Sequence, residues 1–165
     1  MNKKLIIFNI ILASLAAGVL FLVFRSNNGT EVEGVELEDY SDPDVSLENY
    51  RGTPIVANAW AAWCPFCVEE LPEFAKVQDE FEGEVIILAI NREESVGTMQ
   101  RFLNKVDLTF SDLEFLEDSE DTFYREIGGI SMPETLFIDA QGNIVHHKKG
   151  PMRAPEIREK IQDIL

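Results

Sequence analysis

Apolar residues follow two kinds of short pattern from about residue 45 to the C-terminus. The segments Pro54–Trp60 and Glu84–Ile90 are short and almost continuously apolar, which predicts two buried strands. Between them, from Pro65 to Phe81, apolar residues recur at positions 68, 71, 74, 77 and 81, and this spacing predicts a helix. The region therefore begins with a strand, a helix and a second strand.

The rest of this region continues with the same two patterns. Helices are predicted at Ser95–Val106 and Ser119–Ile127, and the chain closes with a further helix at Glu156–Leu165. Before that last helix, Thr135–Asp139 and Ile144–Lys148 flank a turn that contains glycine, which predicts a β-hairpin. This order of elements predicts the α/β fold class, with a mixed sheet that has helices on its faces.

A long apolar segment precedes this region. Residues 5–24 are interrupted only by Asn9 and Ser14, and as a helix they would span about 30 Å, one hydrocarbon core. Lysines precede the segment and an acidic stretch follows it, so the positive-inside rule places the N-terminus in the cytoplasm. We therefore expect residues 1–25 to be an uncleaved signal anchor, a single transmembrane helix. The alternative is a signal peptide cleaved near the small residues at 14–18.

The chain beyond the apolar segment is strongly acidic. There are 30 acidic and 14 basic residues, a net charge of −16, and three of the basic residues flank the apolar segment. Such a domain repels phosphate backbones and anionic headgroups, which argues against nucleic-acid binding. Residues 26–44 are polar and acidic, and we expect a tether there, with a short strand at Val32–Leu37, before a domain over residues 45–165.

The chain has two cysteines, Cys64 and Cys67, separated by two residues. A disulfide scaffold would need more cysteines, more widely spread, and a tetrahedral zinc site would need four ligands. The pair falls between the first predicted strand and the following helix, an order that indicates redox chemistry. We expect neither a metal nor a cofactor at this pair.

Cys64 lies just before the predicted helix, where unpaired backbone N–H groups and the helix dipole stabilise a thiolate. Pro65 suits the first helical position because it has no N–H group. Cys67, one turn into the helix, is placed to resolve a mixed disulfide formed at Cys64. We therefore expect Cys64 to be the exposed attacking thiol and Cys67 to be shielded.

Two segments together resemble the TlpA/ResA/CcmG (DsbE) family of membrane-anchored thioredoxin-like proteins. The first is SLENYRGTPIVANAWAAWCPFC, which ends at Cys67, and the second is ISMPETLFID, which contains Pro133. The resemblance runs from about Val45 to the C-terminus, and Pro-Glu-Thr is similar to the CcmG (DsbE) branch. It implies a thioredoxin-like mixed sheet flanked by helices and a thiol–disulfide oxidoreductase activity.

The resemblance also implies roles for single residues. It implies a cis peptide between Met132 and Pro133, in a loop that faces the cysteines and pairs with a substrate strand through the Met132 backbone. Catalytic roles are expected for Cys64, Cys67, Glu70 and Pro133. Contacts with substrate are expected from Trp63, Pro65, Phe66, Met132 and Glu134.

Glu70 lies three residues after Cys67 and therefore on the same face of the predicted helix. In members of the family an acidic residue at this place sits near the redox pair. Such a group could take the proton of Cys67 when a mixed disulfide resolves. The alternative is a solvated surface glutamate like Glu69. Asn58 stands where cytoplasmic thioredoxins have a buried aspartate, which shifts the expected proton transfer to Glu70.

Two other functions fit the same fold less well. A peroxidase of the peroxiredoxin type needs a hydroxyl-bearing residue three positions before its cysteine, and Ala61 stands there. A copper chaperone would use Cys64, Cys67 and a distant histidine, His146 or His147, since thiolate and imidazole ligands suit copper. In copper chaperones on this fold the two cysteines are usually separated by three residues and not by two. Copper binding remains the alternative function.

The expected function is the reduction of protein disulfides outside the cytoplasm, with cytochrome c maturation as one role and an oxidase role still open. The expected partners are disulfide-containing protein substrates and a membrane thiol donor that re-reduces the chain. A membrane anchor would raise the local concentration of that donor. The expected location is the cell membrane, with a single span and the catalytic domain outside.

Overall fold

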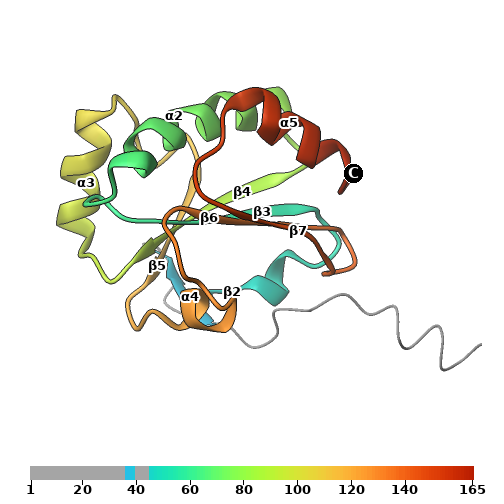
Figure 1. The fold of residues 1–165 in the computed structure, drawn as a ribbon, viewed down its shortest axis with the longest axis horizontal. Helices are drawn as coiled ribbons and strands as arrows, with labels where there is room; N and C mark the ends of the chain where they lie inside the picture. Colours follow the sequence, from blue (N-terminus) through green and yellow to red (C-terminus); the bar gives the residue numbers. More distant parts are fainter. Residues whose placement is uncertain (1–35, 40–44) are drawn as a thin grey trace, which may run out of the picture. The chain divides into compact units, whose positions relative to one another are not determined.

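The computed structural model describes residues 36–39 and 45–165, which form one seven-stranded mixed sheet with helices on both faces (Figure 1). The strands are β1 (Glu36–Asp39), β2 (Val45–Ser46), β3 (Ile55–Trp60), β4 (Ile86–Arg92), β5 (Glu114–Asp118), β6 (Glu134–Ile138) and β7 (Ile144–Lys149). The helices are α2 (Pro65–Glu80), α3 (Val96–Lys105), α4 (Thr122–Glu126) and α5 (Ala154–Gln162), with a 3₁₀ helix η1 (Leu47–Tyr50).

The strand order is β2-β1-β5-β4-β3-β6-β7, and its centre is parallel. β3 pairs with β4 and β4 pairs with β5 in parallel register, whereas β6 is antiparallel to β3 and β7 is antiparallel to β6. Every residue of β3 is buried. A strand covered on both faces needs apolar residues at almost every position, which explains the apolar run from Ile55 to Trp60.

Two hydrophobic layers cover the two faces of the sheet. On one face the core joins residues of α2, α3 and α5, including Phe74 and Phe102, to Trp60 of β3, whose ring lies 4.8 Å from that of Phe102. On the other face Leu47 of η1 and Phe123 of α4 pack against the strands. Figure 1 accordingly shows α2 and α5 on one side of the sheet and α4 on the other.

The structure confirms the predicted fold class and most of the predicted elements. The first strand, the helix after the cysteines, the second strand and the hairpin are all present, with ends that differ by a few residues. One boundary differs for a physical reason. α5 begins at Ala154 and has Pro155 inside its first turn, a position that proline tolerates because the N–H groups there have no helical partner.

β2 and β5 were not predicted, and β1 overlaps only the end of the short strand that was predicted at Val32–Leu37. β5 has only two apolar residues, Phe115 and Leu116, among acidic ones, so its pattern is too short to read as a strand. β1 lies inside the predicted tether, residues 26–44, and pairs with β2 and β5. Residues 36–39 of the predicted tether therefore belong to the sheet, and the remainder of the tether stays a prediction.

The predicted anchor, residues 1–25, lies outside the described residues, as do residues 26–35 and 40–44 of the predicted tether. Of the helices within residues 45–165, none is long and apolar enough to cross a membrane.

Candidate redox site

The two cysteines lie where the chain leaves β3 and enters α2. Cys64 is the N-cap residue of α2, and its Sγ accepts a hydrogen bond from the backbone N–H of Cys67 at 3.3 Å. The two are joined in a disulfide, with their Cα atoms 5.4 Å apart. Pro65 occupies the first turn, as predicted. This turn places the sulfur of Cys64 at the positive end of the helix dipole, where a thiolate is stabilised.

Both cysteines are buried in this disulfide form. Cys64 is 2% exposed and Cys67 is 0% exposed, and both belong to the hydrophobic layer that contains Trp60 and Leu71. The prediction of an exposed Cys64 is therefore wrong for the oxidised chain, because its sulfur packs against that layer. What separates the two thiols is position: Cys64 caps the helix, and Cys67 lies inside it.

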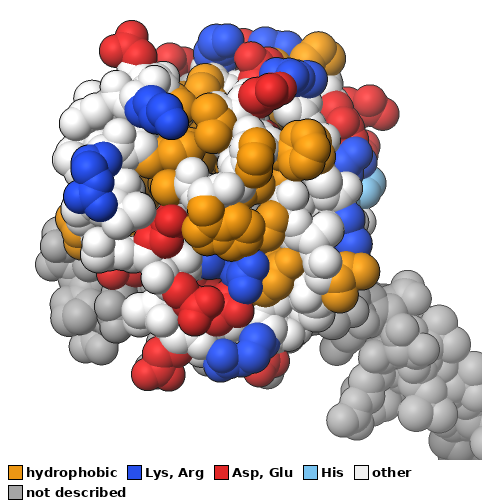
Figure 2. Space-filling view, turned by 60° about the vertical axis from the view of Figure 1, so that its left-hand side comes forward, with side chains coloured by type: hydrophobic (Ala, Val, Ile, Leu, Met, Phe, Trp, Pro, Cys, Tyr) orange, Lys and Arg blue, Asp and Glu red, His pale blue; other side chains and the backbone are white. Residues whose placement is uncertain are grey.

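Exposed apolar side chains border the disulfide. Trp63 is 63% exposed and Phe66 is 57% exposed, and Pro65 between them in sequence is also exposed. Figure 2 brings this side of the molecule forward and shows hydrophobic side chains gathered on it, with charged side chains around them. Exposed apolar surface of this kind is typical of a site that contacts another macromolecule.

Glu70 is buried, with 1% of its surface exposed. Its Oε1 accepts a hydrogen bond from the backbone N–H of Met152 at 2.9 Å, and its Oε2 accepts one from Nδ2 of Asn58 at 3.2 Å. The alternative of a solvated glutamate like Glu69 is therefore excluded. Asn58 also donates to Oγ1 of Thr135 at 3.0 Å, so one amide links β3, α2 and β6.

Burial raises the pKa of Glu70 to about 8, against the opposing effect of the hydrogen bonds from Met152 and Asn58. A carboxyl group with this pKa can accept or release a proton near neutral pH. Glu70 lies three residues after Cys67 in the same helix, so the two side chains share one helical face. Proton exchange between them is chemically reasonable.

The loop that leads into β6 lies beside the end of β3. The Met132–Pro133 peptide is cis, and Glu134 pairs with Ala59 in the antiparallel ladder between β6 and β3. Met132 packs against the hydrophobic layer that contains both cysteines. The sheet thus brings this loop to the edge from which the chain turns toward Cys64.

Glu134 was predicted to bind substrate, and the structure places it elsewhere. It is 0% exposed, and its oxygens accept hydrogen bonds from the backbone N–H groups of Ile130 and Ser131, both at 2.7 Å. Burial raises the pKa of Glu134, but these bonds and one from His147 outweigh it, and the net shift is downward. The side chain has no free surface for a substrate, which corrects the prediction.

The two histidines each pair with a carboxylate. His146 Nε2 lies 2.8 Å from Asp163 Oδ2, and His147 Nε2 lies 2.6 Å from Glu134 Oε2. Among the residues that the structure describes, no three histidine, cysteine, aspartate or glutamate side chains are grouped to hold a metal ion. The copper alternative therefore gains no support from the geometry.

Three residues behind the proline loop were missed. Tyr124 donates a hydrogen bond from its hydroxyl to the carbonyl oxygen of Ser131 at 2.6 Å. The guanidinium of Arg92 lies over its ring and pairs with Asp121. Arg92 lies 29 residues before Asp121, and none of the three belongs to a motif. The only signal in the sequence was the position of Tyr124 in a short predicted helix just before the loop.

Similar proteins carry names from thiol–disulfide exchange. A family model described as the AhpC/TSA family matches residues 28–147. The thiol:disulfide interchange protein DsbE of Vibrio cholerae is 29% identical over 179 residues, 98% of this chain and 93% of that protein. Thiol-disulfide oxidoreductase ResA of Geobacillus thermodenitrificans is 26% identical over 173 residues, 99% and 97% of the two chains. The structure of MTB DsbF aligns with a TM-score of 0.71 at 25% identity, over 79% of this chain and 95% of that one.

Proposed function

The chain belongs to the AhpC/TSA family and is similar to the thiol–disulfide oxidoreductases ResA and DsbE, and we propose that it exchanges disulfides with protein substrates through Cys64 and Cys67. The observation that supports this most is the disulfide at the N-terminus of α2, bordered by exposed Trp63 and Phe66. The helix end favours a thiolate, and the apolar border suits a protein surface.

In the reducing direction, the thiolate of Cys64 attacks one sulfur of a substrate disulfide, and the other substrate sulfur leaves as a thiolate. The product is a mixed disulfide. Cys67 then loses its proton to Glu70 and attacks the sulfur of Cys64, which releases the second substrate thiolate. Two electrons pass from the cysteine pair to the substrate, and the chain is left with the Cys64–Cys67 disulfide.

The proposed cellular setting follows from the N-terminal sequence. With residues 1–25 as an anchor, the domain would lie outside the cytoplasm, and a membrane thiol donor would reduce the Cys64–Cys67 disulfide again. The Pro-Glu-Thr sequence at 133–135 and the similarity to DsbE support cytochrome c maturation as one role. An oxidant would run the same steps in reverse, and the reduction potential of the chain measures which direction is favoured.

The Cys67→Ser variant tests the assignment of the two sulfurs. Without Cys67 the mixed disulfide at Cys64 has no internal thiol to resolve it, so covalent adducts that a reductant releases should accumulate in cells. Non-reducing electrophoresis followed by mass spectrometry measures them. Apocytochrome c adducts would support cytochrome c maturation, and a broad set of secreted proteins would support a general reductase.

The matched control is Cys64→Ser, which should abolish both adducts and turnover. Adducts on Cys67 in that control, at a yield comparable with those on Cys64 in the first variant, would contradict the assignment.

A further inference from the structure

The segment before Pro133 has an unpaired piece of backbone. The ladder between β3 and β6 begins at Glu134, and the carbonyl oxygen of Pro133 accepts a bond from Gly150 N–H at 2.9 Å. Within residues 36–39 and 45–165, no hydrogen-bond partner contacts the backbone N–H or C=O of Met132. Ile130, two residues earlier, is 80% exposed. An extended substrate segment could pair with this open edge.

The rest of this segment is held tightly from within. Glu134 accepts hydrogen bonds from the N–H groups of Ile130 and Ser131, both at 2.7 Å, and from Ser131 Oγ at 3.1 Å. The same carboxylate contacts His147 Nε2 at 2.6 Å. The buried carboxylate of Glu134 therefore fixes the two backbone amides that precede Met132, and it links them to β7 through His147.

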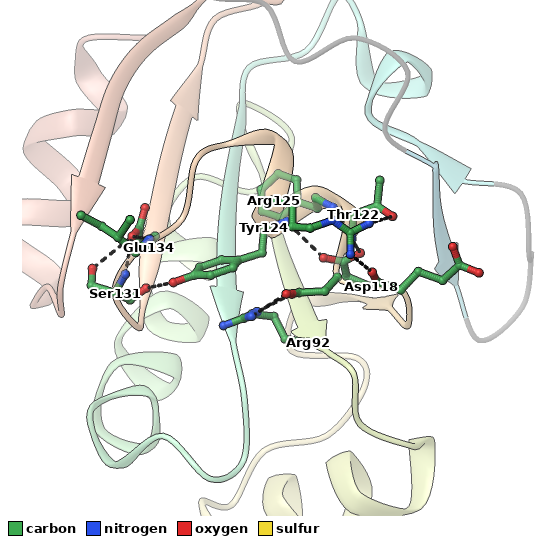
Figure 3. A network of polar contacts seen from close by, with 11 residues as sticks. Arg92, Asp118, Thr122, Tyr124, Arg125, Ser131 and Glu134 are labelled. Atoms are coloured by element: carbon green, nitrogen blue, oxygen red, sulfur yellow. Dashed lines mark hydrogen bonds and ion pairs between the residues drawn. The ribbon is translucent and has the colours of Figure 1, made fainter.

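Tyr124 holds the next peptide group, the one between Ser131 and Met132. Its hydroxyl donates to the carbonyl oxygen of Ser131 at 2.6 Å, and Figure 3 shows the side chain extending from α4 to this residue, with Glu134 beyond it. The ring passes so close to Gly129 that a Cβ there would lie 2.4 Å from a ring carbon. Only glycine at 129 leaves room for this approach.

The ring of Tyr124 is itself held in place. The guanidinium of Arg92 lies 3.4 Å from the ring centroid, within the range of a cation–π contact. Asp121 fixes that guanidinium through two bonds, 2.6 Å from Nε and 2.7 Å from Nη2. Such a planar, two-point contact restricts the arginine more than a single ion pair would.

We propose that Tyr124, supported by Arg92 and Asp121, acts with Glu134 as a positioning residue that holds Ser131 and Met132 in place for pairing with protein disulfide substrates. This inference rests on the proposed function. The hydroxyl of Tyr124 binds Ser131 and its ring contacts Arg92, and neither contact involves a cysteine. Tyr124 therefore acts on the substrate through the loop. Small disulfides, which have no backbone to pair, do not need the loop.

The test uses Tyr124→Phe in the full chain, reduced and then mixed with either insulin or bis(2-hydroxyethyl) disulfide. The variant loses one hydrogen bond to Ser131, so its second-order rate constant with insulin should fall about two- to tenfold. Its rate constant with the small disulfide should stay at the parent value. Amide hydrogen exchange at Ser131 and Met132, measured without any substrate, should become faster.

The matched control is Tyr50→Phe, which removes a tyrosine hydroxyl that donates to Glu114 at a different place in the sheet. It should leave both rate constants and the exchange of the loop unchanged. Unchanged exchange in Tyr124→Phe, or an equal loss of rate with both disulfides, would overturn the inference. A parent that reacts with neither disulfide would instead refute the proposed function, and the exchange measurement would still decide whether Tyr124 holds the loop.

Discussion

At the scale of single residues, the site combines sulfur atoms with a carboxyl group that water does not reach. Glu70 accepts one hydrogen bond at each oxygen, from Met152 and Asn58. Two bonds do not replace the hydration that a carboxylate loses on burial, and the pKa rises to about 8. The carboxyl group is therefore neutral in mildly acidic solution, and it becomes able to accept a proton as the pH approaches 8.

The raised pKa of Glu70 predicts a pH-dependent stability. Between its ordinary value of 4.5 and about 8, the folded chain keeps the proton that the unfolded chain has lost. Stability of the parent should therefore fall as the pH rises through this window and level off above it. Glu70→Gln removes this loss. From pH 5 to pH 8, the free energy of unfolding of the variant should therefore rise by roughly 2–4 kcal/mol relative to that of the parent. Chemical denaturation of the oxidised chain at both pH values measures it.

Glu69→Gln is the matched control, because Glu69 is exposed on the same helix. Its stability should follow the parent's pH dependence throughout. If the curve of Glu70→Gln also runs parallel to that of the parent, Glu70 does not titrate in this window and the proposed proton transfer loses its base.

Some of these residues could be predicted from the local sequence pattern, and others could not. Spacing alone placed Cys64 at a helix end and Glu70 on the face of Cys67, because both depend on local geometry. It could not show that Glu70 is buried, since that depends on Met152, 82 residues away. Glu134 was given the wrong role for a different reason: Ile130 and Ser131 are close to it in the sequence, but their N–H groups reach its carboxylate only when the loop folds back.

At the scale of elements, α4 shows how a short helix can serve a loop. It has five residues, too few for stability by itself, and its N-cap residue Asp121 has a left-handed backbone and makes no capping bond. Asp118, at the end of β5, supplies the missing acceptors. The apolar pattern did not predict β5, because three of its five residues are acidic and one of these, Asp118, is buried for capping.

The Asp118→Ala variant tests this capping. The carboxylate accepts backbone bonds from Thr122 at 2.6 Å and from Phe123 and Tyr124 at 3.2 Å each, so its removal leaves three donors of α4 without their acceptor. We expect the free energy of unfolding to fall by about 1–3 kcal/mol. Thermal and chemical denaturation measure the change. Glu126→Ala, an exposed position in the same helix, is the control, and an equal loss there would contradict a specific role for Asp118.

At the scale of the whole molecule, charge and hydropathy separate the chain into two parts. Three of its 14 basic residues flank the apolar segment 5–24, and all 30 acidic residues follow it. A strongly acidic domain has no electrostatic attraction to an anionic bilayer, so any attachment to the membrane must come from the apolar segment. The proposed exchange with a membrane thiol donor depends on that attachment.

The membrane topology of the chain can be measured with its only two cysteines, Cys64 and Cys67, as reporters. If residues 1–25 anchor the chain with its N-terminus inside, the protein should resist alkaline extraction from membranes. After mild reduction of intact cells, a membrane-impermeant maleimide should label it. Replacing Lys3 and Lys4 with glutamine removes the charges that hold the N-terminus inside and leaves Arg25, so the labelled fraction should fall. A mature form that begins near Ala17 or Gly18 would refute the anchor, because the span would then have been removed with the signal peptide.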